Sequence, residues 1–176
     1  MRSGAAFVLG VVVTLAVLAG GGWLYLHYGH PPVAAADTPF PMEAQIVKAP
    51  LNARIHREMQ KAPFAGNAQV YGAGAEVYAE QCEFCHGGPA QDSEVAKWMY
   101  PAAPQLWKKH AKGNVVGVSD DEPGETFWKV KNGIRLTGMP SFEHVLSEEQ
   151  MWDVTLLLKA ADQPMPDAVR QELGGK

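Results

Sequence analysis

The sequence predicts an all-α fold, in which a few helices form one small domain behind a single N-terminal transmembrane helix and an extended linker. The first observation is an uncharged apolar run at residues 5–26. The second is the helical spacing of apolar residues at both ends of the remaining chain, where the segment AEVYAEQ has no strand-like run of branched side chains. The third is size, because about 150 residues follow the apolar run, enough for one modest core.

The apolar run, AAFVLGVVVTLAVLAGGGWLYL, is the first predicted element. At about 1.5 Å of rise per residue, a helix of this length can cross a hydrocarbon core of roughly 30 Å. A cleaved signal peptide is the alternative, with a small-residue cleavage site at residues 34–36, but the run is longer than the core of a usual signal peptide. Arg2 is the only charge before the run, which places residues 1–4 in the cytoplasm. We therefore expect an uncleaved anchor, and either alternative exports the rest of the chain.

Residues 27–70 are rich in proline and lose the helical periodicity, so we expect them to form a mostly extended linker. A short helix is possible over residues 51–60, where Leu51, Ile55 and Met59 fall on one face. A plain spacer is favoured over a docking segment. A flexible spacer of about 44 residues would hold its ends roughly 35–40 Å apart, far enough to move between neighbouring membrane complexes.

The folded domain is expected to begin near residue 71 with a helix that carries Gly74, Tyr78 and Cys82 on one face. A glycine on that face allows another helix to approach closely. The expected partner is the segment SEEQMWDVTLLLKAA, in which Ser147 acts as N-cap and Gln150 follows three residues later. These two helices are predicted to cross and close the domain.

The only two cysteines of the chain, Cys82 and Cys85, lie in the segment QCEFCHGG and are followed at once by His86. Such a trio is typical of a redox-active dithiol, half of a zinc site or the attachment site of a c-type haem. A zinc site needs more soft ligands than the chain offers nearby, and a dithiol is expected where a strand enters a helix. On a helical turn the two sulfurs can bond to the porphyrin edge while the imidazole meets the iron. The spacing therefore predicts one covalently attached haem c.

The pattern GxxxYxxxCxxCHG, a later Met-Pro pair and an aromatic-rich terminal helix resemble a class I (mitochondrial-type) cytochrome c in a membrane-anchored bacterial form. The resemblance covers residues 71–161 and leaves residues 162–176 as a C-terminal tail. It implies a few helices wrapped around one haem whose edge is exposed. It also implies that Tyr78 belongs to the cofactor-binding residues, and that the carbonyl of Pro104 accepts a hydrogen bond from the ring of His86.

The sixth iron ligand is expected to be Met139, because its thioether lies in a loop bounded by glycine and proline, NGIRLTGMPSF. The distal methionine of the resembled family is similarly placed. Met99, His110 and His144 remain as alternative ligands, and Met99 is favoured among these three.

Two further groups of residues are expected to have structural or solvating roles. Four tryptophans are assigned to packing rather than to electron conduction: Trp98, Trp107, Trp128 and Trp152. Two charged runs are expected to be solvated faces, with docking to a charged partner as the alternative: Lys108, Lys109 and Lys112, and then Asp120, Asp121, Glu122 and Glu125.

With His86 and Met139 both on the iron, no position is open for a substrate, and the chain is predicted to be an electron carrier rather than an enzyme. It would take electrons from a quinol-oxidising complex or a periplasmic dehydrogenase and pass them to a terminal acceptor such as an oxidase. The alternatives are a fixed haem subunit of a larger respiratory or dehydrogenase complex and, as a third class, a haem enzyme or gas sensor. The formal net charge of -4 argues against nucleic acid as a partner, and no small-molecule substrate is predicted. The predicted location is the bacterial cytoplasmic membrane, with the haem domain in the periplasm.

Overall fold

The structure, a computed structural model, describes residues 2–111 and 113–174 and divides into two compact units, Met1–Phe40 and Pro41–Lys176. Lys112, a member of the predicted basic run, lies outside the described residues. The described part of the chain is helical without any strand, apart from one isolated bridge between Lys109 and Val116. The prediction of an all-α protein is confirmed.

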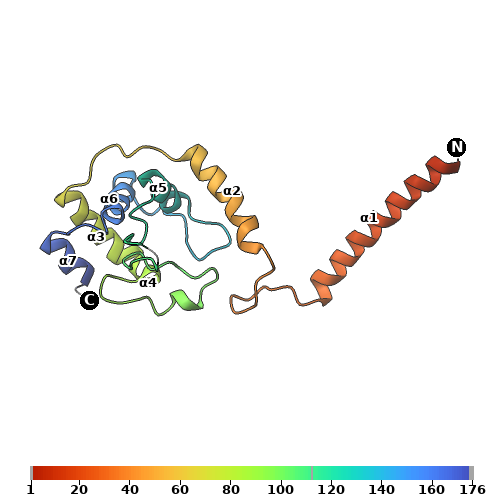
Figure 1. The fold of residues 1–176 in the computed structure, drawn as a ribbon, viewed down its shortest axis with the longest axis horizontal. Coiled ribbons are helices and arrows are strands. Elements are labelled where there is room, and N and C mark those ends of the chain that lie inside the picture. The colour runs from red at the N-terminus through yellow and green to blue at the C-terminus, as the bar shows by residue number, and fades with distance from the viewer. Residues whose placement is uncertain (1, 112, 175–176) are drawn as a thin grey trace. The chain divides into compact units, whose positions relative to one another are not determined.

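The first unit is built on helix α1 (Arg2–Tyr28), shown in red in Figure 1. Within it, Ser3–Tyr28 is long and apolar enough to cross a membrane, and its side chains are exposed. The rings of Trp23 and His27 lie 4.4 Å apart near the end of the helix, and Tyr28 follows. Amphipathic rings at such a position suit a membrane interface. The unit therefore fits the predicted single-pass anchor.

The second unit begins with a helix that the sequence only partly predicted, α2 (Glu43–Glu58). It starts eight residues before the short helix that was expected at residues 51–60, and it includes Pro50. Ile55 is 1% exposed, and α2 packs against α5 (Pro123–Asn132). Trp128 on α5 donates a hydrogen bond of 2.9 Å from Nε1 to Glu58. The expectation of a mostly extended segment is therefore wrong here, because a helix with a single buried residue has almost no apolar periodicity.

The core of the second unit forms where α3 (Ala68–Gln81) packs against α6 (Glu148–Lys159). Gly74 makes this contact possible, because a Cβ atom there would overlap the backbone carbonyl of Asp153. Ser147 and Gln150 form a complete capping box at the start of α6. The predicted contact between these two helices, with a glycine at the contact, is confirmed.

Two aromatic rings and a further helix complete the core. Phe127 of α5 stacks on Trp152 of α6, with ring centroids 4.0 Å apart. Helix α7 (Asp167–Gly174) buries Val169 and Leu173 and packs against α3 (Figure 1). The segment at residues 162–176 was expected only as a tail. This segment buries only two apolar residues, spaced four positions apart. Two such residues are too few to predict a packed helix from the sequence.

The tryptophans follow the packing expectation with one exception. Trp152 and Trp128 are buried, and the rings of Trp107 and Tyr78 form a T-shaped pair with centroids 5.6 Å apart. Trp98 is 74% exposed, so the packing expectation is wrong for this residue. It lies in the one-turn 3₁₀ helix η1 (Ala96–Trp98), where only Ala96 faces the core.

Candidate functional site

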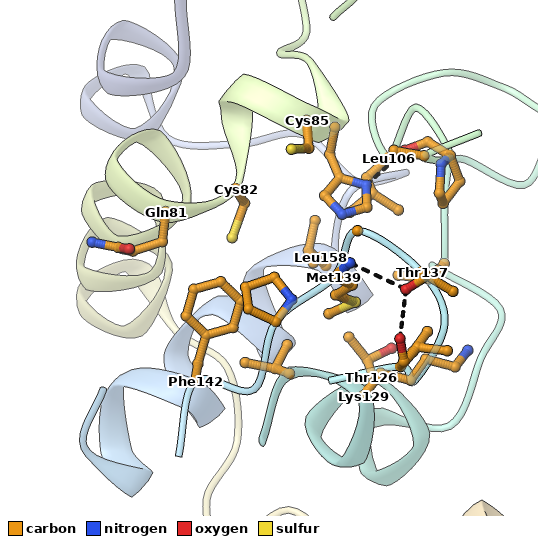
Figure 2. Close-up of a pocket in the computed structure, with 18 of the residues that line it drawn as sticks. Gln81, Cys82, Cys85, Leu106, Thr126, Lys129, Thr137, Met139, Phe142 and Leu158 are labelled. Atoms are coloured by element: carbon orange, nitrogen blue, oxygen red, sulfur yellow. Dashed lines mark hydrogen bonds between the residues drawn. The ribbon is translucent and has the colours of Figure 1, made fainter. Parts of the chain in front are cut away.

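A single apolar cavity gathers most of the predicted site residues (Figure 2). Its walls come from the end of α3, the short helix α4 (Glu83–His86), the loop at residues 99–106, α5, the loop at residues 133–142, and α6. The space amounts to about 1090 Å³ when its open mouth is included. A cavity with mostly apolar walls and an open mouth suits an apolar ligand.

The attachment motif forms one wall of this cavity. The amides of Cys85 and His86 both donate to the carbonyl of Cys82, at 3.1 and 2.9 Å, which closes a helical turn. All three side chains line the cavity, and Figure 2 shows the sulfur atoms of Cys82 and Cys85 on the side of α3 and α4. Two thiols and an imidazole therefore face the same cavity from one helical turn.

The electrostatics of the thiols argue against a redox-active dithiol. Burial, together with the neighbouring Cys85, raises the pKa of Cys82 to about 12. A reactive dithiol needs a lowered pKa. In the described residues, moreover, no three His, Cys, Asp or Glu side chains are grouped in a way that could hold a metal ion. Of the three alternatives that the cysteine motif offers, covalent attachment is the one that neither observation opposes.

His86 is held by the backbone of a loop far along the chain. Its Nδ1 lies 2.8 Å from the carbonyl oxygen of Pro104, which assigns the proton to Nδ1 and leaves the lone pair of Nε2 free for a metal. Burial lowers the pKa of His86, and the bond to Pro104 partly offsets this effect. The neutral imidazole is the form that binds iron. The structure thus brings Pro104 to the place that the resemblance implies.

The loop that carries Met139 forms the facing side of the cavity, and in Figure 2 Met139 reaches into the space from it. Thr137 organises the loop, because its Oγ1 donates to the carbonyl of Ile134 at 2.7 Å and accepts from the amide of Met139 at 3.1 Å. Met99 also lines the cavity. His110 and His144 do not line it, so the structure brings together two of the four candidate sixth ligands.

The residues that line this cavity fit a haem: two thiols and an imidazole on one wall, a thioether on another, and apolar side chains between them. Residues 69–157 match the family model described as cytochrome c oxidase, cbb3-type, subunit III. The chain belongs to this family of c-type cytochromes. Membership implies covalently bound haem c and haem-based electron transfer. No curated protein matches the chain.

Tyr78 lies outside the cavity lining of this c-type cytochrome. Its hydroxyl donates a hydrogen bond of 2.6 Å to the carbonyl of Gly87, which has a φ of 68° and ends the attachment turn. Burial raises the pKa of Tyr78, so its hydroxyl keeps its proton. The geometry therefore makes Tyr78 a positioning residue for the turn that carries His86, and direct contact with a cofactor has no support in the structure.

The sequence did not single out Lys129 and Thr126, which line the cavity from α5. Lys129 binds Glu125 at 2.6 Å and Asp121 at 3.5 Å. Burial raises the pKa of Asp121, although the charge of Lys129 lowers it. The acidic run is therefore only partly a solvated face, because two of its members neutralise a lysine at the cavity wall. Only the helical spacing of residues 126 and 129 could have indicated this.

Proposed function

We propose that this protein is a mono-haem, membrane-anchored carrier of single electrons on the periplasmic side of a bacterial cytoplasmic membrane. Its donor is a quinol-oxidising complex or a periplasmic dehydrogenase, and its acceptor is a terminal oxidase. One observation carries the proposal: His86, with Nε2 free, and the thioether of Met139 line the same cavity. When bound, the haem supplies one-electron chemistry at its iron, and two protein ligands leave no position open for oxygen or peroxide.

Each site residue has its own task in this proposal. Cys82 and Cys85 would hold the haem by thioether bonds, and the imidazole of His86 would bind its iron. The carbonyl of Pro104 orients the ring of His86 and raises its basicity. The thioether of Met139 would supply the second iron ligand, and a thioether in an apolar cavity favours the reduced state. The protein is then a carrier and has no substrate of its own.

The proposed location depends on helix α1 and on the chemistry of attachment. The helix is long enough to span a membrane, and the charge of Arg2 favours a cytoplasmic N-terminus. Haem attachment to a CxxCH motif takes place on the outer side of that membrane, where the second unit would then lie. The redox partners would be reached within the periplasm or at the membrane surface.

The first test is the absorption spectrum of the oxidised and reduced protein in washed membranes, with and without carbon monoxide. We expect a c-type spectrum, a weak near-infrared sulfur-to-iron band in the oxidised protein, and no response to carbon monoxide. A spectrum that lacks the sulfur band and shifts with carbon monoxide would favour a haem enzyme or gas sensor.

Variants separate the roles of the ligands. Cys82→Ala or His86→Ala should yield no stable protein with covalent haem, and normal haem content in either would contradict the attachment site. Met139→Ala should keep the haem but bind carbon monoxide. Met42→Ala, at an exposed methionine outside the cavity, serves as the matched control.

A fixed haem subunit of a larger respiratory complex is the second candidate. Two observations favour it: the description of the matched family, and the packing of α2 on α5, which shortens the free part of the tether. Solubilisation in a mild detergent distinguishes the two candidates. A carrier would elute alone, whereas a subunit would elute with its complex in a constant ratio.

A further inference from the structure

Met99 and Met139 lie 40 positions apart in the chain, yet both line the same cavity. The side chain of Met99 reaches the loop of Met139 at Gly138. A Cβ atom at position 138 would overlap the terminal methyl of Met99 and lie 3.9 Å from its sulfur. The absence of a side chain at Gly138 is therefore what admits Met99.

The loop of Met139 is also held by hydrogen bonds within itself and to the end of α5, where Ser141 Oγ donates to the carbonyl of Lys131 at 2.7 Å. The amide of Ile134 donates to the carbonyl of Met139 at 3.2 Å, and Thr137 bonds to both residues. Leu136 has a φ of 63° and is exposed. Apart from the chain neighbours of Gly138, Met99 supplies the only described atoms within 4 Å of the position of that missing Cβ. The contact with Met99 is therefore a support that reaches this point of the loop from a distant segment.

The segment that carries Met99 is itself anchored beside His86. Met99 donates its amide to the carbonyl of Ala96 at 3.2 Å, and the amide of Ala96 donates to Ser93 Oγ at 3.1 Å. The amide of Ser93 donates to the side chain of Gln105 at 2.8 Å, and Pro104, the residue before Gln105, accepts the bond from His86. One segment, residues 93–105, thus touches the ring of His86 at one end and the neighbour of Met139 at its middle.

We propose that Met99 is a positioning residue that holds the loop of Met139 in its ligating position, and that residues 93–105 support both axial ligands together. The role is one of packing, and the sulfur of Met99 does not bind iron. The inference rests on the proposed function, because it takes Met139 as the second axial ligand. Without the side chain of Met99, the loop would open more often and expose the iron to added ligands.

The test uses the full-length holoprotein in detergent, with imidazole as the added ligand and two readouts: the sulfur-to-iron band and the rate of imidazole binding. Met99→Ala should keep the band at equilibrium but bind imidazole about tenfold faster, equivalent to about 1.4 kcal/mol. Met99→Leu, which restores the volume without the sulfur, should return the rate to that of the unchanged protein. Met42→Ala, at an exposed methionine outside the cavity, should leave the rate unchanged.

A second variant keeps the proposal open to test if Met99→Ala does not fold. Gly138→Ala should displace the methyl of Met99 and raise the rate of imidazole binding in the same way, and combination with Met99→Ala should add little.

A rate of imidazole binding in Met99→Ala within twofold of that of the unchanged protein would overturn the proposal, as would a fast rate in Met99→Leu. Loss of the band in Met99→Ala together with its retention in Met139→Ala would make Met99 the ligand and also overturn it. Failure of the proposed function is seen separately, because the unchanged protein would then lack the sulfur band or bind carbon monoxide.

Discussion

At the scale of single residues, Tyr78 connects the core to the attachment turn. Its hydroxyl satisfies the carbonyl of Gly87, and Gly87 is buried with a positive φ. A buried carbonyl that loses its hydrogen-bond donor costs free energy, whereas the ring of a phenylalanine at position 78 would still fill the same space. The hydroxyl therefore stabilises the turn, and the ring stabilises the core.

Tyr78→Phe should consequently lower the free energy of unfolding by about 1–3 kcal/mol while the protein keeps covalent haem and its visible spectrum. The measurement is denaturant unfolding of the holoprotein, followed by circular dichroism. Tyr71→Phe on the same helix is the matched control, since the hydroxyl of Tyr71 has no hydrogen bond to any described residue. Equal stability of the Tyr78 and Tyr71 variants would show that the bond to Gly87 contributes nothing.

The residues of the site differ in how far the sequence could predict them. The cysteine pair and His86 are adjacent in the chain, so a helical turn is enough to place them together. Pro104 was expected through the family resemblance alone, and Met139 through its loop bounded by glycine and proline together with that resemblance, because a fold decides which distant loops meet. Lys129 was missed, because a lysine four residues after a glutamate on a helix is usually a solvated member of a surface ion pair.

At the scale of elements, the contact between α3 and α6 yields a matched pair of glycine variants on one helix. Gly74→Ala should destabilise the protein by about 1–3 kcal/mol or more, because the added methyl meets the backbone of Asp153 and cannot be accommodated by a rotamer change. Gly72→Ala should instead be neutral or stabilise by up to about 1 kcal/mol, because a Cβ there meets nothing within 4 Å and alanine favours a helix. Thermal unfolding measures both. Destabilisation by the two changes alike would mean that α3 does not tolerate alanine for reasons other than its contact with α6.

Helix α2 permits a similar comparison of two isoleucines. Ile55→Ala should lower stability by about 2 kcal/mol or more, because Ile55 is fully buried against the rest of the unit. Ile46→Ala on the same helix should change stability by less than about 0.5 kcal/mol, because Ile46 is 65% exposed. Chemical denaturation, combined with hydrogen exchange over residues 43–58, gives the measurement. If Ile55→Ala behaves like Ile46→Ala, α2 is a spacer after all.

The elements also show what sequence patterns can and cannot reveal. Helices α3 and α6 carry several buried residues each, with an N-cap or a capping box at their start, and both were predicted close to their observed bounds. Helices α2 and α7 bury one and two residues, so each depends on contacts made by the rest of the fold. Tertiary packing rather than local propensity stabilises such helices, and a single sequence does not contain that information.

At the scale of the whole molecule, the docking of α2 changes the length of free chain between the anchor and the domain. Helix α1 ends at Tyr28 and α2 begins at Glu43, so about 14 residues connect them. A flexible chain of that length has an average end-to-end distance of roughly 20 Å, compared with the 35–40 Å expected for an extended linker over residues 27–70. The shorter tether restricts the proposed carrier to partners near its anchor, and it is equally compatible with a fixed subunit.

The division into two units leads to a prediction about truncation. Replacement of residues 1–40 by a cleavable secretory signal should yield a water-soluble holoprotein with an unchanged spectrum and thermal midpoint, because Pro41–Lys176 has its own core.

Removal of residues 1–62 should also give a soluble product. Its thermal midpoint should be lower by roughly 10 °C, since the contacts of Ile55 and the hydrogen bond from Trp128 to Glu58 are then lost. Differential scanning calorimetry compares the two products with the detergent-solubilised full chain. If the shorter truncation already lowered the midpoint, residues 1–40 would contribute to the fold of the haem domain. If the longer one left it unchanged, α2 would be separable from that domain, and the full length of the linker would again be free to move.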